Sequence, residues 1–171
     1  MVTNLKGKYL IFNNWCIENF GFSKKELTAM TIIDLTSPDD LKNSNLLFNK
    51  LIKGEIEKYQ LEKRYIRKDK SSFWAEVSVS AIKDKNNKVV NTIGVVIDIT
   101  ARKKSEQALQ NSENFAKATF NALSSQIAVL DENGYLLSVN TAWQNFAEAN
   151  APKEAKIKMP IGVNYLTICT N

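Results

Sequence analysis

The chain has 171 residues, of which 44% are hydrophobic and 24% carry a charge, so it is long enough to bury the core of one domain or slightly more. It contains no histidine, which excludes a histidine phospho-acceptor, a Ser-His or Cys-His nucleophile pair, histidine-ligated haem and a mixed Cys/His zinc site. The net charge is +5, but basic and acidic residues are interleaved along the chain, so no nucleic-acid partner is expected.

Membrane and metal signals are absent from the sequence. Its apolar runs are far shorter than the roughly 18 to 20 residues that cross a bilayer, and the first residues lack the pattern of a secretory signal. We therefore expect no membrane span and a cytoplasmic location. The two cysteines, Cys16 and Cys169, have no paired metal-ligand spacing, so we expect buried free thiols and no metal site.

Strand and helix signals alternate from the N-terminus. Residues 8–12 are rich in β-formers, and the pair Asn13-Asn14 then supplies a side-chain acceptor for the start of a helix that runs to Phe20. Ser23 and Glu26 have the spacing of a capping box and predict a second short helix.

The Ser-Pro-Asp-Asp stretch over 37–40 predicts the start of a longer helix. Ser37 is placed to cap, the proline at the first helical position loses no hydrogen bond, and the two carboxylates face the positive end of the helix dipole. Apolar residues then recur at helical spacing as far as Ile52, and Gly54 suits the exit.

Three strand-like segments follow the helices. Residues 57–67 form the first, and residues 73–81 form the second, in which apolar and polar side chains alternate so that one face is dry. The third segment puts Ile93, Val95, Ile97 and Ile99 on what we expect to be the inner face. Together the segments predict an antiparallel meander that the earlier helices cover.

A long polar helix, capped by Thr100, is predicted next and ends near residue 122. Its first turn is basic, which is the wrong sign for a helix N-terminus, and Asp98 is expected to compensate locally. Leu109 and Leu123 lie two heptads apart on a short apolar seam. The seam leaves two interpretations open, a helix that forms a homodimer and a solvated connector.

The sequence repeats itself after this helix. Residues 131–140 restate residues 4–13, and a tryptophan follows each stretch within three residues. A second copy of the same domain therefore starts there. No second set of three meander strands follows, so the second copy cannot form a complete core of its own.

Six stretches occur in an order that is more specific than any of them alone. They are Gly7 to Asn13, Phe20 to Leu27, Ser37 to Asp40, Arg67 to Asp69, Trp74, and Asp98 to Lys104. In this order they resemble the PAS family of sensory domains. The resemblance implies an α+β fold, with a five-stranded antiparallel sheet and helices on one face. It predicts a PAS/PAC sensory domain over 1–104, a connector helix over 105–122, and the N-terminal half of a second, incomplete PAS-like unit over 123–171.

Two positions depart from the family pattern. The first turn of the meander commonly has a glycine after Lys-Asp, where this chain has Lys70, and Asn87 replaces a common glycine in the second turn. A lysine with positive φ is strained, so we expect a different turn type at this position.

The resemblance implies that the chain senses a signal and passes it through the closing strand into the connector helix. In that interpretation Asp98, Thr100 and Arg102 couple the sheet to the helix. Helix capping alone also explains the aspartate and the threonine, so both interpretations stay open.

The resemblance further implies a small-molecule ligand between the long helix and the sheet, of unknown identity. The flavin photosensors of the family carry an Asn-Cys-Arg motif in which neither cysteine of this chain lies, so no photoadduct is expected. An ordinary packed core explains the same apolar face without a ligand. The residues expected to line the pocket are Phe48, Leu51, Tyr65, Val79 and Ile93.

These features predict a ligand-binding and signal-relay module of a multidomain signal-transduction protein. Sensor histidine kinases of two-component systems and cyclic-dinucleotide enzymes are the expected parents, with the output domain outside this chain and no catalytic residue within it. One alternative is a structural homodimerisation module without a ligand. Another is a small stand-alone enzyme acting through Asp39 and Asp40, but neighbouring helix residues diverge by about 100°, so capping explains this pair better.

Overall fold

The computed structural model of the chain describes residues 1–150 and 161–165. Two compact units are present, Met1–Glu106 and Gln107–Asn171. The long helix α5 (Thr100–Ala122) begins in the first unit and continues into the second.

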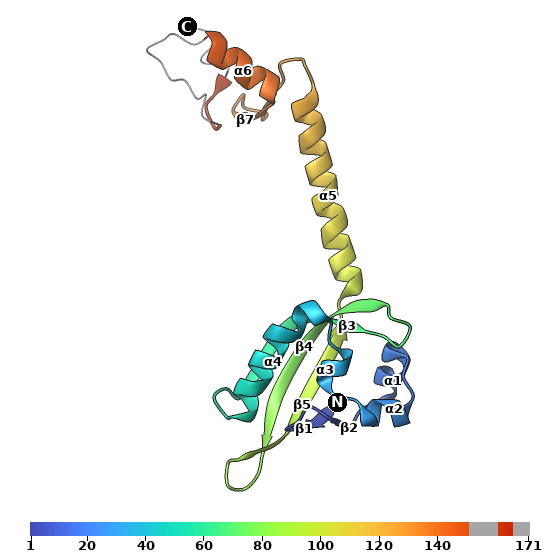
Figure 1. Ribbon diagram of the computed structural model, residues 1–171. Helices are drawn as coiled ribbons and strands as arrows, with labels where there is room; N and C mark the ends of the chain where they lie inside the picture. Colours follow the sequence, from blue (N-terminus) through green and yellow to red (C-terminus); the bar gives the residue numbers. More distant parts are fainter. Residues whose placement is uncertain (151–160, 166–171) are drawn as a thin grey trace. The chain divides into compact units, whose positions relative to one another are not determined.

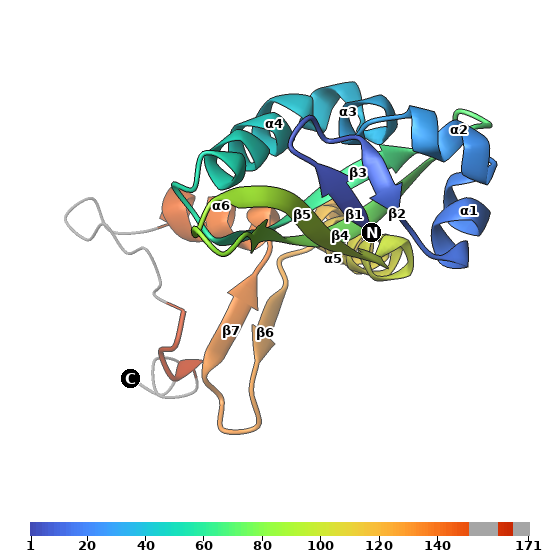
Figure 2. The same cartoon turned by 90° about the horizontal axis from the view of Figure 1, so that it is seen from below.

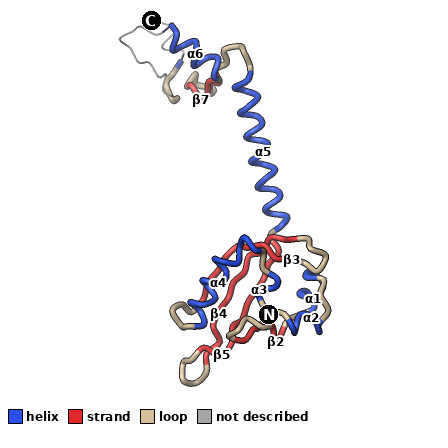
Figure 3. Tube along the Cα trace, viewed as in Figure 1, coloured by secondary structure: helices blue, strands red, loops and turns tan. Residues whose placement is uncertain are grey.

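A five-stranded antiparallel sheet forms the first unit, in the order β2-β1-β5-β4-β3. Figure 1 shows the three long strands as a meander, and Figure 3 shows the short N-terminal hairpin beside them. The hairpin places β1, which the sequence analysis did not predict, against β5. The strands are β1 (Val2–Asn4), β2 (Tyr9–Ile11), β3 (Lys58–Ile66), β4 (Ser72–Lys83) and β5 (Val89–Asp98).

Four helices lie on one face of this sheet and none of the four lies on the other, as Figure 2 shows. The predicted α+β class, with an antiparallel sheet and helices on one face, is therefore confirmed. The helices are α1 (Asn14–Phe20), α2 (Lys24–Ala29), α3 (Ile32–Leu35) and α4 (Pro38–Ile52).

The helix starts follow the predicted caps except at Ser37 and at Thr100, whose hydroxyl binds the backbone N–H of Trp74. The Asn13 side chain accepts a hydrogen bond from the backbone N–H of Cys16, and Ser23 and Glu26 form the capping box of α2. Ser37 occupies the N-cap position of α4, but its side chain makes no capping bond, so that part of the prediction was wrong. Its backbone instead ties α4 to the sheet, because the Ser37 N–H donates to the Arg64 carbonyl at 2.9 Å.

Aromatic residues from α1, β3 and β4 meet at the centre of the core. The ring centroid of Phe20 lies 5.0 Å from that of Tyr65 and 5.6 Å from that of Phe73. Trp15 approaches Phe20 and Phe73 edge-on, at 6.4 and 6.3 Å. Aromatic pairs at such distances add about 0.5–1.5 kcal/mol beyond the burial of their area. The cluster therefore fixes α1 against the sheet.

Strand β5 presents the face opposite to the predicted one. Ile93, Val95 and Ile97 are exposed by 46%, 58% and 54%, whereas Thr92 and Gly94 lie towards the core. The prediction of the inner face, and with it the placement of Ile93 in a pocket, was wrong. Alternation in a sequence defines two faces of a strand, but it does not say which of them the helices cover.

The inner side of β5 takes small residues. A Cβ atom added to Gly94 would lie 3.5 Å from Met1 Cγ and 3.8 Å from Val79 Cγ2, which are ordinary van der Waals contacts, so Met1 and Val79 pack directly over this glycine. The hydroxyls of Thr92 and Thr3 are buried and lie 2.7 Å apart, so each polar group has a partner. Small and mutually hydrogen-bonded side chains therefore face the core here, and the large aliphatic ones face away from it.

The turn between β3 and β4 also differs from expectation. Lys70 adopts a φ of 69°, the left-handed conformation that the sequence analysis had argued against. The turn is held by its neighbours, since the Asp69 carboxylate accepts hydrogen bonds from the N–H and the hydroxyl of Ser71 at 2.9 and 2.6 Å. These bonds offset the strain of a non-glycine residue with positive φ, which costs on the order of 1 kcal/mol.

The second unit repeats the opening of the first down to single hydrogen bonds. The Asp131 Oδ1 atom accepts from the Asn133 N–H at 2.9 Å, as Asn4 Oδ1 accepts from the Lys6 N–H at 2.9 Å. A glycine with positive φ follows in each turn. The repeat read from the sequence is therefore a repeat of structure.

The helix that follows this hairpin is capped in the same way in both units. Asn140 Oδ1 accepts from the Trp143 N–H at 3.0 Å, and Asn13 Oδ1 accepts from the Cys16 N–H at 3.4 Å. Among residues 107–150 and 161–165 there is no counterpart of β3, β4 or β5, and the incomplete second unit stays a prediction. Its elements are β6 (Ala128–Leu130), β7 (Leu136–Val139) and α6 (Thr141–Asn150).

Replacing Phe20 by alanine should destabilise the first unit by about 3–5 kcal/mol, because the substitution opens a cavity in the aromatic cluster. Urea denaturation followed by tryptophan fluorescence measures the loss. Leu46→Ala is the matched control, since this side chain belongs to the first unit and is 55% exposed, and its loss should change stability by less than about 0.5 kcal/mol. Equal losses in the two variants would contradict the assignment of the core.

Candidate functional site

A small cavity lies between the helices and the inner face of the sheet. Its volume is about 20 Å³, which is room for one group of the size of a water molecule. The wall is made by residues of the N-terminal hairpin, α3, α4 and the three long strands. They are Met1, Thr3, Ile32, Phe48, Tyr59, Lys63, Tyr65, Val77, Val79 and Gly94.

The five residues predicted to line a pocket have different positions. Phe48, Tyr65 and Val79 lie on the wall of the cavity. Leu51 is fully buried in the surrounding core without reaching the wall, and Ile93 lies on the uncovered face of the sheet. Whether these residues bind a ligand stays a prediction.

Lys63 is a wall residue that was not predicted from the sequence, and its side chain carries a charge. Its side chain is only 3% exposed, and its ammonium donates to Thr36 Oγ1 at 2.9 Å and to Ser44 Oγ at 3.0 Å. The ammonium also lies 4.5 Å from the centroid of the Tyr65 ring. The one available signal was its place on the apolar parity of β3, between Leu61 and Tyr65. Lysine at such a position is rarely buried without a partner.

Burial lowers the pKa of Lys63 from 10.5 to about 8, although the nearby Asp40 carboxylate raises it in part. Asp40 itself is engaged elsewhere, because it accepts from the backbone N–H of Arg64 at 2.8 Å and from Nε of the same residue at 3.0 Å. Lys63 therefore remains mostly protonated at pH 7 in a nearly dry environment.

On the other face of β3, Glu62 binds the first turn of the connector helix. One carboxylate oxygen lies 2.7 Å from Arg102 Nη2 and the other lies 2.6 Å from Lys103 Nζ. These bonds from Lys103 and Arg102 lower the pKa of Glu62. We call these three residues the Glu62 ion-pair cluster. This cluster explains why the first turn of α5 is basic. Cations are unfavourable at the N-terminus of a helix dipole, but Arg102 and Lys103 each pair with a carboxylate of the sheet.

Two of the predicted relay residues, Asp98 and Thr100, join the end of β5 to the start of α5. Asp98 Oδ1 accepts from the Thr100 N–H at 2.8 Å, as expected of local compensation at a helix start. Thr100 is the first residue of α5, and its hydroxyl accepts from the backbone N–H of Trp74 at 3.1 Å instead of capping the helix. The helix start is thereby bound to β4 as well as to β5.

The Trp74 ring connects α4 with α5 through cations. Arg64 lies 5.3 Å and Lys103 lies 5.4 Å from its centroid. Arg64 in turn pairs with Asp39 and Asp40, each at 3.0 Å. The two carboxylates meet on one guanidinium despite their divergence on the helix, so they serve as the attachment of α4 to β3.

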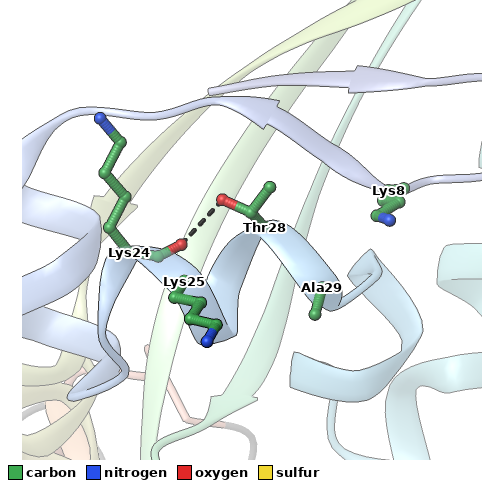
Figure 4. A pocket seen from close by; sticks show the side chains of 5 residues that line it. All are labelled: Lys8, Lys24, Lys25, Thr28 and Ala29. Carbon is green, nitrogen blue, oxygen red and sulfur yellow. Dashed lines mark hydrogen bonds between the residues drawn. The ribbon is translucent and has the colours of Figure 1, made fainter.

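A shallow depression on the surface, shown in Figure 4, is lined by the start of β2 and by α2. The side chains of Lys24 and Lys25 leave α2 in different directions, and the Thr28 hydroxyl donates a hydrogen bond to the Lys24 carbonyl at 2.7 Å. Because the two lysines do not converge on one point, these residues do not form an anion-binding site. Its lining residues are Lys8, Lys24, Lys25, Thr28 and Ala29.

Among residues 1–150 and 161–165, no group of three or more carboxylate, thiol or imidazole side chains is arranged to hold a metal ion. No helix in this part of the chain combines the length and apolar character needed to span a bilayer. Cys16 is a buried free thiol, as predicted, and Cys169 lies outside the described residues.

Residues 1–101 match the sequence profile of the PAS domain, which is more than half of the chain. The chain belongs to the PAS domain family. A solved PAS domain from Colwellia psychrerythraea superposes with a TM-score of 0.54 and 25% identity, covering 58% of this chain and 84% of that one. The PAS domain therefore coincides with the sheet, the four helices and the cavity.

Two curated relatives of this PAS chain are signalling proteins. The probable diguanylate cyclase DgcE of Escherichia coli is 33% identical over 105 residues, which are 61% of this chain and 10% of the relative. The sensor histidine kinase TmoS of Ectopseudomonas mendocina is 25% identical over 89 residues, which are 52% of this chain and 9% of the relative. The chain thus spans about a tenth of the length of these relatives, and its PAS domain is a sensory domain of the kind found in signalling proteins.

The buried charge of Lys63 predicts a stability that rises with pH. Between pH 8 and pH 10 the unfolded chain holds a proton on this lysine that the folded chain has lost, so the free energy of unfolding increases, by roughly 3 kcal/mol at most. Lys63→Met should remove this increase. Buried phenols and the Cys16 thiol also titrate, but equally in both proteins, so the difference between the two denaturation profiles reports Lys63.

Lys58→Met is the control for this measurement, because Lys58 lies on the same strand and is exposed. This variant should keep the increase between pH 8 and pH 10. A Lys63→Met profile parallel to that of the unmodified chain would show that the folded protein does not lower the pKa of the lysine.

Proposed function

We propose that the PAS domain of this chain is a ligand-binding sensor that passes its state through β3 into the connector helix α5. The output domain of the parent protein, of the diguanylate cyclase or histidine kinase kind, would lie outside this chain and carry the catalytic activity. The two signalling relatives support this assignment. The chain itself would contribute binding and relay, with no chemical step.

One observation carries the proposal, namely that adjacent residues of β3 reach the cavity and the connector. Lys63 lies on the cavity wall, and Glu62 forms the ion-pair cluster with Arg102 and Lys103. Consecutive residues of a strand point to opposite faces. A small change in the position or pleat of β3 at the cavity therefore moves the carboxylate that binds α5.

Electrostatics make the attachment of α5 sensitive to such a change. Glu62 lies directly opposite Glu76 on β4, and like charges in this position destabilise a strand pair. The cations at 102 and 103 relieve that repulsion, while near the helix N-terminus they are unfavourable for α5 itself. The ion pairs with Glu62 therefore hold the first turn of α5, although the same cations interact unfavourably with the helix dipole. Weakening these ion pairs should make the first turn of α5 less stable.

The three predicted relay residues fit this mechanism in different ways. Arg102 belongs to the Glu62 ion-pair cluster. Asp98 and Thr100 hold the helix start to β5 and β4, which is a positioning role. We propose that Lys103 and Glu62 complete the relay.

We further propose that α5 associates with α5 of a second copy. All of its residues are described and none is buried, and Leu109 and Phe115 are exposed by 63% and 74%. Helices in proteins are stabilised chiefly by packing of an apolar face, and the heptad spacing of Leu109 and Leu123 favours a coiled-coil partner. The alternative of a dimerisation module without a ligand shares this interface and differs only at the cavity.

The relay is tested by amide hydrogen exchange of residues 103–106 in the purified chain. Lys63→Met should speed exchange there by about threefold or more, because its ammonium ties β3 to Thr36 and Ser44. Glu62→Gln should have a similar effect, and adding Lys63→Met to it should change little, since both act through one path.

Lys58→Met and Glu113→Gln are the matched controls, one exposed on β3 and the other exposed on α5. Both should leave the exchange of residues 103–106 unchanged. An effect of Lys63→Met no larger than that of Lys58→Met would refute the relay.

The association of α5 is tested by analytical ultracentrifugation. Leu109→Glu places a charge on the apolar seam and should weaken dimerisation about tenfold or more. Asn111→Glu adds the same charge on the opposite side of the helix, since two positions turn it by about 200°, and should leave the dimer intact. Equal behaviour of the two variants would show that the seam is not the interface.

A further inference from the structure

A groove lies beside Met1, at the point where β1 would continue away from its hairpin. Its volume is about 350 Å³, which is room for several amino-acid residues of an extended chain in part or for a small molecule. The start of α1 forms one wall with Asn13, Trp15 and Cys16, and residues 94–96 of β5 form the other. We call it the Asn13 groove.

The β5 wall of the groove presents unused backbone groups of Val96. The Met1 nitrogen donates to the Gly94 carbonyl, and the Gly94 N–H donates to the Met1 carbonyl, both at 2.8 Å. Alternate residues of a strand direct their backbone groups to the same neighbouring strand, so Val96 directs its own to the side on which β1 lies. No strand of the described part of the chain pairs with this edge of β5 beyond Gly94. The edge therefore has one vacant pairing position.

The opposite wall has unused hydrogen-bonding groups on Asn13. Its side chain is exposed, and its Oδ1 atom accepts from the N–H and the thiol of Cys16 at 3.4 and 3.3 Å. The first contact is long and a thiol is a weak donor. Within residues 1–150 and 161–165, neither the backbone N–H of Asn13 nor its side-chain amide N–H groups have an acceptor.

The second unit shows what the same asparagine binds. Asn140 is the equivalent of Asn13, and it is fully buried by the chain that precedes β6. Its Oδ1 atom accepts from the Ile127 N–H at 2.9 Å, and its backbone N–H donates to the Ile127 carbonyl at 3.0 Å. The side-chain amide donates to the carbonyls of Leu123 and Ser125 at 3.2 and 2.7 Å.

The contacts of Asn140 fit the first unit in the same register. The two hairpins pair equivalently, so the equivalent of Ile127 is a residue placed directly before Met1. Its backbone groups would face Asn13. Those of the residue before it would face Val96, because the two sides alternate along a strand. One extended segment therefore meets the unused groups of both walls.

We propose that the Asn13 groove is a docking site for an extended peptide segment that continues β1 and adds to the edge of β5. The segment is joined to Met1, as residues 123–127 are joined to β6. In the second unit this segment follows α5, so the groove gives the first unit an attachment for a preceding helix. The inference goes beyond the proposed relay between β3 and α5 and does not depend on it.

Fusing a copy of residues 121–127 directly before Met1 of the full chain tests this docking. The isoleucine of the copy then occupies the position equivalent to Ile127. The Val96 N–H gains an acceptor, so its hydrogen exchange, followed by NMR, should slow by about tenfold or more relative to the unfused chain. Unchanged exchange of the Val96 amide would overturn the proposal.

Asn13→Asp separates docking from helix capping in the fused chain. The aspartate still accepts from the Cys16 N–H as a cap, but it has no amide to donate to the carbonyls of the segment. It should remove most of the protection of Val96 while circular dichroism shows a folded protein. Asn14→Asp places the same charge on the neighbouring exposed residue and should keep the protection. Equal protection in the two variants would count against the groove.

Adding the free peptide to the unfused chain tests the source of the segment. A capped peptide of residues 121–127 lacks the effective concentration of a short covalent link, which is on the order of 1 mM. At micromolar concentration it should therefore leave the exchange of Val96 nearly unchanged. Saturating protection by micromolar peptide would show that a separate chain is sufficient, and it would overturn the attachment to Met1.

Discussion

The pleat of β3 is the constraint on which the rest of the first unit depends. Because successive side chains of a strand point to opposite faces, Lys63 enters the core while its neighbours Glu62 and Arg64 remain outside. Each of these three binds a different part of the molecule. Lys63 reaches α3 and α4, Arg64 holds the N-terminus of α4, and Glu62 holds the start of α5. A single strand thus joins the helical layer, the cavity and the connector.

The energetic consequence is that the interior and the connector are not independent. A buried ammonium weakens the domain unless it is neutralised, and the first turn of α5 depends on a carboxylate one residue away. Both interactions are made by charged side chains and not by the packing of apolar surfaces. Such contacts change readily with proton or ligand binding, whereas the aromatic cluster around Phe20 stays fixed and supplies the rigid frame.

The duplicated opening in the second unit shows which part of the fold is locally encoded. The turn bonded by Asn4 recurs at Asp131, and the cap of Asn13 recurs at Asn140. These features need only residues a few positions apart. The charged strand and its cavity have no counterpart among the described residues of the second unit, so the proposed sensing and relay belong to the first unit alone.

The sequence by itself determined the features with a short range. Capping boxes, the strand alternation of residues 73–81, the long polar helix and the repeat all follow from residues close together in the chain. The resemblance to PAS domains supplied the five-stranded antiparallel sheet and the placement of the helices on one face. Lys70 shows the limit of such rules, since hydrogen bonds of Asp69 with Ser71 hold a conformation that propensity disfavours.

Only the tertiary structure decided which face of each strand is covered. The sequence pattern predicts Ile93 as a core residue, whereas in the fold the helices cover the opposite side of β5, on which Thr92 and Gly94 lie. In the sequence little distinguishes Lys63 from the other lysines, and its burial is known only once Thr36 and Ser44 are seen to bind its ammonium. Likewise, the ion pair of Glu62 is known only from the position of α5 beside β3. The physical reason is that burial and ion pairing depend on residues distant in the chain, and a local pattern does not contain those distances.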